Sequence, residues 1–177
     1  HPWQHKHYRR RIGSMNTNGA PNKKFTFSDK EKVEKILSQY SDKKSATLPL
    51  LHLAQSEKGY ISGAVINSVA DLVDCHPAVV MDCVSFYTMF YTKPHGRHII
   101  QVCQTLSCSL NGADALVDQV ADKYGIQPGE TTKDDRLTLM KVECLGSCGT
   151  APVVQINNEY HEGLSEEKFA DLLESLP

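Results

Sequence analysis

Two stretches of similar layout, RHIIQVCQTLSC at residues 97–108 and LTLMKVECLGSC at residues 137–148, determine how the second half of this chain folds. Each starts with an apolar run that predicts a buried strand, over Arg97–Cys103 and Leu137–Glu143, and each then enters a loop that carries two cysteines. Because the ends of adjacent strands in one sheet lie close together, we expect four thiols to meet at one end of this domain: Cys103 and Cys108 as C-x4-C, and Cys144 and Cys148 as C-x3-C.

The segments around these strands predict a small mixed sheet with helices. A helical stripe covers Ala113–Tyr124, and Ser165 is placed to cap a final helix. Between them, the runs Val153–Asn157 and Glu159–Glu162 predict a hairpin that turns at Asn157-Asn158. The resulting order, β-α-β-β-β-α, is typical of a thioredoxin-like domain.

The first half of the chain has the periodicity of helices instead. Helices are predicted from Asp29, over Thr47–Lys58, after Ser62 and from Pro77. An aromatic-rich connector over residues 85–96 ends in Pro94 and Gly96 and precedes the first strand. The side chains expected to face inward include Val33, Ile36, Leu37 and Tyr40 in the first helix, and Val79, Val80, Cys83 and Val84 in the fourth.

The start of the chain distorts its composition. The stretch HPWQHKHYRRRIGS at residues 1–14 is interpreted as an expression tag, and residues 15–27 as a flexible N-terminus. A helical bundle over residues 28–92 and a mixed-sheet domain over residues 93–177 then make an α+β protein. Removing the four basic residues of the tag changes the net charge from −2 to −6, so the remaining chain is mildly acidic.

Composition and patterning exclude several classes of function. A net charge near zero gives no bulk attraction to nucleic acid, and no apolar stretch approaches the roughly 20 residues that a membrane-spanning helix needs. The polar residues after Met15 carry no secretory signal and no organelle address, which predicts an intracellular and reducing location. Structural disulfides are therefore not the expected use of the cysteines.

Four thiolates that meet at one point suit a soft metal centre, either one tetrahedral zinc ion or an iron–sulfur cluster. One cysteine pair per loop matches a [2Fe–2S] cluster, in which each iron takes two cysteines, although it departs from the plant-type C-x4-C-x2-C spacing. A zinc-stabilised interaction module therefore stays open at this point. A thiol–disulfide oxidoreductase would need unusual spacing, because the chain has no C-x-x-C.

The remaining cysteines and the histidines have simpler interpretations. Cys75 and Cys83 are expected to pack in the helical core as small apolar side chains. Histidines replace two cysteine ligands in Rieske centres, but with two complete cysteine pairs we expect them to be surface or hydrogen-bonded residues: His52, His76, His95, His98 and His161. No G-x-G-x-x-G follows a predicted strand, so the chain is not expected to bind a dinucleotide by itself.

The cysteine loops resemble a known family. The residues CQTLSCSLNGA at 103–113 and CLGSCGTAP at 144–152 are similar to the small [2Fe–2S] subunit of the NADH-dehydrogenase module of respiratory complex I, often called the twenty-four-kilodalton or NuoE type. The upstream stretch SFYTMFYTKPHGRH at residues 85–98 and the element Gly59-Tyr60-Ile61 also look like that family. The resemblance runs from about residue 28 to the C-terminus and implies a thioredoxin-like [2Fe–2S] ferredoxin domain after a helical bundle.

This resemblance implies a function and a set of partners. One [2Fe–2S] cluster, held by Cys103, Cys108, Cys144 and Cys148, would exchange single electrons with the FMN of a partner flavoprotein that also binds NADH. The chain would then be an enzyme only as a subunit of NADH:quinone oxidoreductase, with no catalytic residue or substrate site of its own. We expect it at the cytoplasmic face of a bacterial inner membrane, held there by the complex without entering the membrane, in preference to a mitochondrial matrix. The equivalent diaphorase subunit of an NAD-linked hydrogenase or formate dehydrogenase is the alternative.

Overall fold

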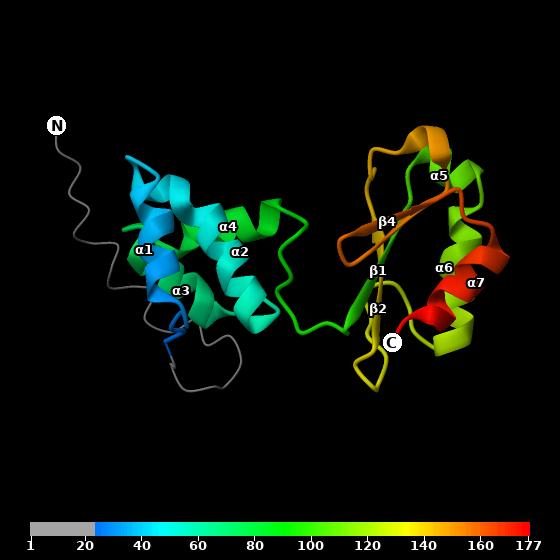
Figure 1. The fold of residues 1–177 in the computed structure, drawn as a ribbon, viewed down its shortest axis with the longest axis horizontal. Helices are drawn as coiled ribbons and strands as arrows, with labels where there is room; N and C mark the ends of the chain where they lie inside the picture. Colours follow the sequence, from blue (N-terminus) through cyan, green and yellow to red (C-terminus); the bar gives the residue numbers. More distant parts are fainter. Residues whose placement is uncertain (1–23) are drawn as a thin grey trace. The chain divides into compact units, whose positions relative to one another are not determined.

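The computed structural model of the protein describes residues 24–177. The predicted tag at residues 1–14 and residues 15–23 of the predicted N-terminal segment lie outside the described residues. The chain divides between Lys93 and Pro94 into two units, and each unit has its own cluster of buried apolar side chains. The first unit is helical, and the second contains the sheet (Figure 1).

Capping residues fix the ends of the helices in the first unit. Asp29 accepts a hydrogen bond from the Lys32 backbone N–H at 2.9 Å, and the Ser62 hydroxyl accepts one from the Val65 N–H. Gly59, with a φ of 84°, ends the second helix in the left-handed conformation. The predicted helices are therefore confirmed. Residues 24–93 contain α1 (Lys30–Ser38), the 3-10 helix η2 (Lys43–Ala46), α2 (Thr47–Lys58), α3 (Gly63–Leu72) and α4 (Pro77–Phe86).

The core of this unit lies between the helices, but two of the predicted inward positions are wrong. Tyr40 is 37% exposed because α1 ends at Ser38, so the helical stripe does not reach it. Val79 is 46% exposed because α4 is apolar around most of its circumference and directs Val80 and Val84 into the core instead. The fully buried side chains of this core include Leu50, Leu51, Ala54, Val65, Val69 and Val80.

No single helix within residues 24–177 has the length and apolar composition needed to cross a membrane. The helices α3 and α4 reach that length only together, and the pair bends by 118° at the break between them.

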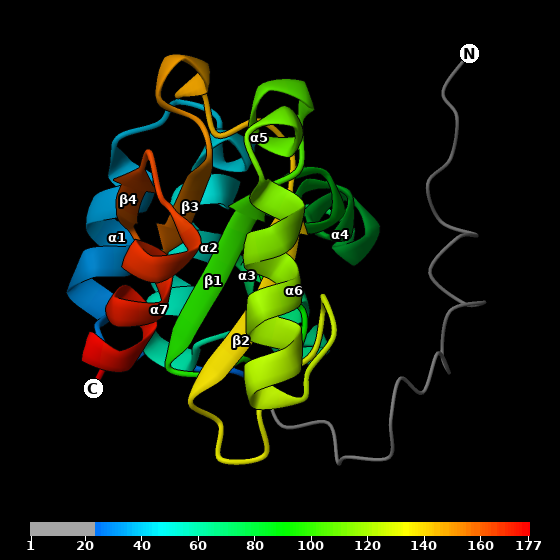
Figure 2. The same cartoon turned by 90° about the vertical axis from the view of Figure 1, so that its right-hand side faces the viewer.

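The second unit is organised around a mixed sheet with the strand order β2-β1-β3-β4 (Figure 2). The central strand β1 (His98–Cys103) pairs in parallel with β2 (Leu137–Val142) and antiparallel with β3 (Val153–Ile156). The strand β3 pairs with β4 (Glu159–Glu162) through a turn at Asn157, so the predicted hairpin is confirmed. All residues of β1 are buried.

Helices α6 (Ala113–Tyr124) and α7 (Glu166–Ser175) cover one face of this sheet (Figure 2). The connection from β1 to β2 passes through α6, which is the crossover that parallel neighbouring strands need. The predicted α+β class is therefore confirmed. The side chains that join the helices to the sheet in one core include Ile100, Val102, Leu116, Val120, Phe169 and Leu173.

Two short elements beside the cysteines are not predicted by the sequence pattern. The helix α5 (Leu106–Leu110) follows Cys103 and contains Cys108, and the 3-10 helix η3 (Cys148–Thr150) starts at the last cysteine. Leu106 and Leu110 are 75% and 77% exposed, so α5 has no inward apolar stripe that could reveal it in the sequence.

Candidate metal centre

The parallel pairing of β1 with β2 brings the two cysteine loops together. Cys103 is the last residue of β1 and lies beside Val142, the last residue of β2. One residue further on, the Gln104 N–H still donates to the Val142 carbonyl oxygen at 2.9 Å. Both chains therefore leave the sheet at the same edge, and the cysteine loops begin side by side.

The first thiol pair is buried. Cys103 is 1% exposed and Cys108 is 2% exposed, because α5 turns the chain back toward the end of β1. Burial raises the pKa of Cys103, but hydrogen bonds from the Thr105 side chain and from the backbone N–H groups of Thr105 and Leu145 outweigh it, so this pKa is lowered overall. The pKa of Cys108 is raised, first by burial and then by its hydrogen bond with Cys103.

The second thiol pair is exposed. The Sγ atoms of Cys144 and Cys148 lie 3.5 Å apart, and the Gly146 N–H points at the Cys144 Sγ at 3.4 Å. This N–H lowers the pKa of Cys144, with further hydrogen bonds from Cys148 and Thr105. The pKa of Cys148 is raised by its hydrogen bond to Cys144. In each pair, one thiol is thus the stronger acid and its neighbour is the weaker.

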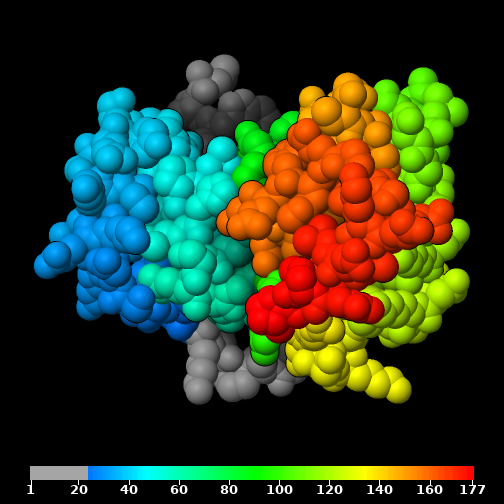
Figure 3. Space-filling model, turned by 45° about the vertical axis from the view of Figure 1, so that its right-hand side comes forward, coloured from blue at the N-terminus to red at the C-terminus, as the bar shows by residue number. Residues whose placement is uncertain are grey.

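Thr105 connects the two pairs. Its Oγ1 lies 3.1 Å from the Cys103 Sγ, and the same hydroxyl also lowers the pKa of Cys144. Electrostatic interactions also join Cys148 to Cys103 and to Cys108. In the space-filling view, α5 (yellow-green) and the η3 segment (amber) lie next to each other at the upper end of the second unit (Figure 3). The four predicted thiols therefore gather at one end of the sheet.

The donor set fits an iron–sulfur centre. All four donors are thiols, which are the ligands that Fe–S clusters require. Within residues 24–177, no three His, Cys, Asp or Glu side chains are placed to hold a single metal ion between them. The thiols are arranged as two pairs instead, each able to serve one metal position. Binding would require all four thiols to lose their protons, since thiolates are the ligating form.

The other cysteines and the histidines lie elsewhere. Cys75 and Cys83 are partly buried against the helical core of the first unit. The four clustered thiols belong to the second unit. The histidines make ordinary structural contacts. His76 caps α4, the His52 ring packs 5.0 Å from that of Phe90, and the ring nitrogens of His95 and His98 bond to backbone carbonyl oxygens.

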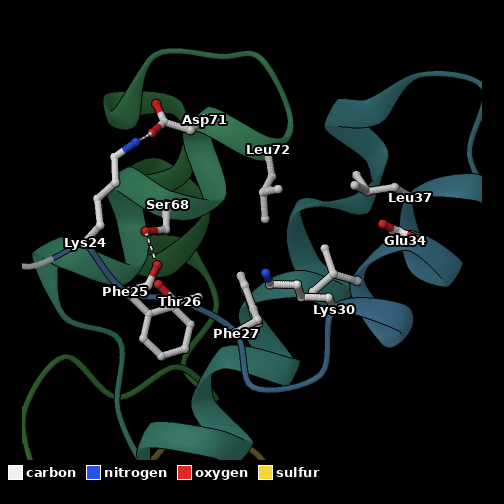
Figure 4. Close-up of a pocket in the computed structure, with 11 residues that line it drawn as sticks. Lys24, Phe25, Thr26, Phe27, Lys30, Glu34, Leu37, Ser68, Asp71 and Leu72 are labelled. Carbon is white, nitrogen blue, oxygen red and sulfur yellow. Dashed lines mark hydrogen bonds and ion pairs between the residues drawn. The ribbon is translucent and has the colours of Figure 1, made fainter.

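A separate hollow of about 410 Å³ lies in the helical unit (Figure 4). It opens between α1 and α3, with the Lys24–Asp71 ion pair at its rim and the Ser68 hydroxyl bonded to the Phe25 carbonyl oxygen. No cysteine lines this hollow, so it is not part of the thiol site.

The residues that support the thiols are not apparent from the sequence. Thr105 is visible only as an ordinary polar residue in a loop. Gly146 in the second loop could be recognised from the sequence, because glycine readily adopts a positive φ. Its φ is 85°, and this conformation brings its N–H to the Cys144 sulfur.

The profile of the thioredoxin-like [2Fe–2S] ferredoxin family matches residues 33–177. The chain belongs to this family. Membership implies a [2Fe–2S] cluster, in agreement with the gathered thiols. This ferredoxin is 40% identical over 146 residues to a subunit of the NADH-quinone oxidoreductase of Rhizobium meliloti, and the match covers 82% of this chain and 87% of the relative. It is 42% identical over 154 residues to NADH-quinone oxidoreductase subunit 2 of Thermus thermophilus, and that match covers 85% of each chain.

A solved structure of an NAD+-reducing [NiFe]-hydrogenase in the air-oxidized state also resembles this ferredoxin. The TM-score is 0.65 at 25% sequence identity over 73% of this chain. The match covers 22% of the hydrogenase chain, so the ferredoxin corresponds to about a fifth of that longer chain.

Proposed function

We propose that this ferredoxin is the electron-transfer subunit of an NADH:quinone oxidoreductase and holds one [2Fe–2S] cluster. Cys103 and Cys108 would bind one iron, and Cys144 and Cys148 would bind the other. The observation that carries the proposal is the convergence of two thiol pairs at the ends of β1 and β2. Two relatives that are subunits of such a complex support the proposal, because each matches most of this chain and most of its own length.

The chain's own residues prepare the site for a negatively charged centre. Burial of the first pair keeps water away from one side of the site. The Gly146 N–H and the Thr105 hydroxyl donate toward sulfur and stabilise negative charge there. The cluster, when bound, accepts and returns one electron at a time.

Hydride chemistry belongs to a partner in this proposal. The chain has no G-x-G-x-x-G after a strand and no phosphate-binding loop, so we assign NADH and FMN to a neighbouring flavoprotein subunit. The ferredoxin would dock against that subunit and exchange electrons with the flavin. It would lie at the cytoplasmic face of a bacterial membrane through the assembled complex, and fractionation of the native host before and after dissociation of the complex tests this location.

Cluster assembly in cysteine variants tests the proposal. The wild-type protein is expected to be reddish-brown and to give an EPR signal after reduction. Cys144→Ser and Cys148→Ser should each lose most of the visible absorption, whereas the matched control Cys75→Ser should keep it. A colourless wild-type protein with one zinc ion per chain contradicts the proposal. Equal loss in Cys75→Ser would show that the ligand set is wrong.

A diaphorase subunit of an NAD-linked hydrogenase is the second candidate. The observation that favours it is the fold likeness to the NAD+-reducing hydrogenase. Purification of the protein from its native host separates the two candidates. Co-purification with NADH-dependent quinone reduction supports the first, and co-purification with hydrogen-dependent NAD+ reduction supports the second.

A further inference from the structure

The loop that carries the second thiol pair is tied to the edge strand β4 by one carboxylate. The Ser147 hydroxyl donates to Oε1 of Glu162 at 2.5 Å, and the Thr150 hydroxyl donates to Oε2 at 2.8 Å. The two hydroxyl oxygens also lie 2.9 Å from each other. Next to this contact, the Gly163 N–H donates to the Thr150 carbonyl oxygen at 2.7 Å. Glu162 thus contacts the residues on both sides of Cys148.

This polar contact adds to the packing of the loop, in which Leu145 and Ala151 lie against the core of the unit. Cys144, Cys148 and Thr150 are exposed, and Ser147 is half-buried. The first pair differs, since Cys103 and Cys108 are part of the buried core of the unit. The hydrogen bonds of Glu162 therefore restrain Ser147 and Thr150, which lie on either side of Cys148.

We propose that Glu162 is a positioning residue that holds Cys148, and with it the second thiol pair, in the arrangement that receives the metal. This inference rests on the proposed [2Fe–2S] function. Glu162 is not itself a ligand, because each of its carboxylate oxygens already accepts a hydrogen bond from the loop. The hydroxyls of Ser147 and Thr150 also keep the pKa of Glu162 below its usual value, so the acceptor stays ionised at neutral pH.

Removal of the carboxylate should loosen the loop without unfolding the sheet. In Glu162→Ala, both hydroxyls lose their charged acceptor, and we expect backbone amides of residues 144–150 to exchange about tenfold faster in the metal-free protein. Glu162→Gln keeps the length of the side chain and a carbonyl acceptor, so it should restore much of the protection. Glu159 lies at the other end of β4, and within residues 24–177 its carboxylate has no hydrogen-bond partner, so Glu159→Ala is the matched control.

The experiment has two readouts on the full-length chain. Hydrogen exchange of the metal-free protein, followed by mass spectrometry, reports the loop directly. The loss of visible absorption in the presence of a chelator reports how firmly the loaded protein holds its metal, and it should be about tenfold faster in Glu162→Ala than in the wild type. Thermal unfolding of the same samples checks that the sheet remains intact.

The readouts separate this inference from the proposed function. Faster exchange and faster loss in Glu162→Ala, with rescue by Glu162→Gln and no effect of Glu159→Ala, support the positioning role. Exchange and loss in Glu162→Ala that equal those of Glu159→Ala overturn it. A wild-type protein that never loads a cluster contradicts the proposed function, and hydrogen exchange in the metal-free chain still decides whether Glu162 holds the loop. Where Glu162→Ala does not accumulate, the double variant Ser147→Ala/Thr150→Ala replaces it.

Discussion

At the scale of single residues, the hydroxyl of Thr105 has the most telling position. It lies 3.1 Å from the Cys103 Sγ and also lowers the pKa of Cys144, so it influences one thiol of each pair. A hydrogen bond to a ligating sulfur stabilises the more negative, reduced form of a cluster. Thr105 is therefore placed to influence the redox chemistry of the site without being a ligand.

Substitution of Thr105 should change the reduction potential. Thr105→Val has nearly the same shape but no donor, so we expect the midpoint potential to fall by some tens of millivolts, about the worth of one hydrogen bond in a one-electron couple. Thr105→Ser keeps the hydroxyl and should stay near the wild-type value. A redox titration followed by EPR measures both. Equal shifts in the two variants would show that the hydrogen bond does not set the potential.

The sequence predicts the thiols of the candidate site but not their supports. Cys103, Cys108, Cys144 and Cys148 are recognisable because their spacing follows two apolar strands. Thr105 and Glu162 become meaningful only through contacts made by the folded chain, and the bond from Ser147 to Glu162 spans 15 residues. Local periodicity and capping rules carry no information on such contacts.

At the scale of elements, the close approach of β1 and β2 depends on Gly96. Gly96 is buried just before β1, and its N–H donates to the Thr138 hydroxyl. A Cβ atom added there would lie 2.8 Å from backbone atoms of Leu137 and 2.9 Å from the Arg136 carbonyl carbon. Backbone atoms cannot move aside as a flexible side chain can, so the two parallel strands would have to separate.

Gly96→Ala should therefore destabilise the second unit. We expect the free energy of unfolding of this unit to fall by about 1–3 kcal/mol, the usual cost of a forced overlap in a packed region. Urea denaturation of the metal-free protein measures the change. Gly149→Ala is the control, because a Cβ at Gly149 meets no atom within 4 Å. A loss of stability in Gly149→Ala as large as that in Gly96→Ala would contradict the steric explanation.

Helix boundaries are predictable where a capping residue marks them. The bounds of α2 agree with the prediction because Gly59 takes the left-handed conformation at its end. The short helix α5 is not predictable, since Leu106 and Leu110 face solvent and leave no apolar stripe. Val79 shows the opposite problem, because a short helix that is apolar on most sides does not reveal which face is buried.

At the scale of the whole molecule, the chain contains two cores that share no residue. One core belongs to the helices of the first unit, and the other joins the sheet to α6 and α7. All four candidate ligands lie in the second unit, Pro94–Pro177. The sequence predicts a boundary between residues 92 and 93, and we propose that the second unit is an independent domain.

A fragment that consists of residues 94–177 tests this proposal. It contains a complete sheet, a complete core and both thiol pairs, so we expect it to fold and to bind the cluster. Circular dichroism and the visible spectrum after reconstitution measure the two properties, with the full chain as the reference. A fragment that is unfolded, or that folds but stays colourless while the full chain is coloured, would show that the helical unit is needed.

The unequal exposure of the two thiol pairs affects how the metal-free protein reacts with oxidants. An oxidant that reaches the metal-free chain meets Cys144 first, because this thiol is exposed and its lowered pKa favours the reactive thiolate. Its neighbour Cys148 lies 3.5 Å away and can resolve the oxidised sulfur into a disulfide. The buried pair would remain reduced in such a chain. Insertion of the cluster therefore competes with oxidation of the second thiol pair, and a chain with the Cys144–Cys148 disulfide can no longer bind the cluster.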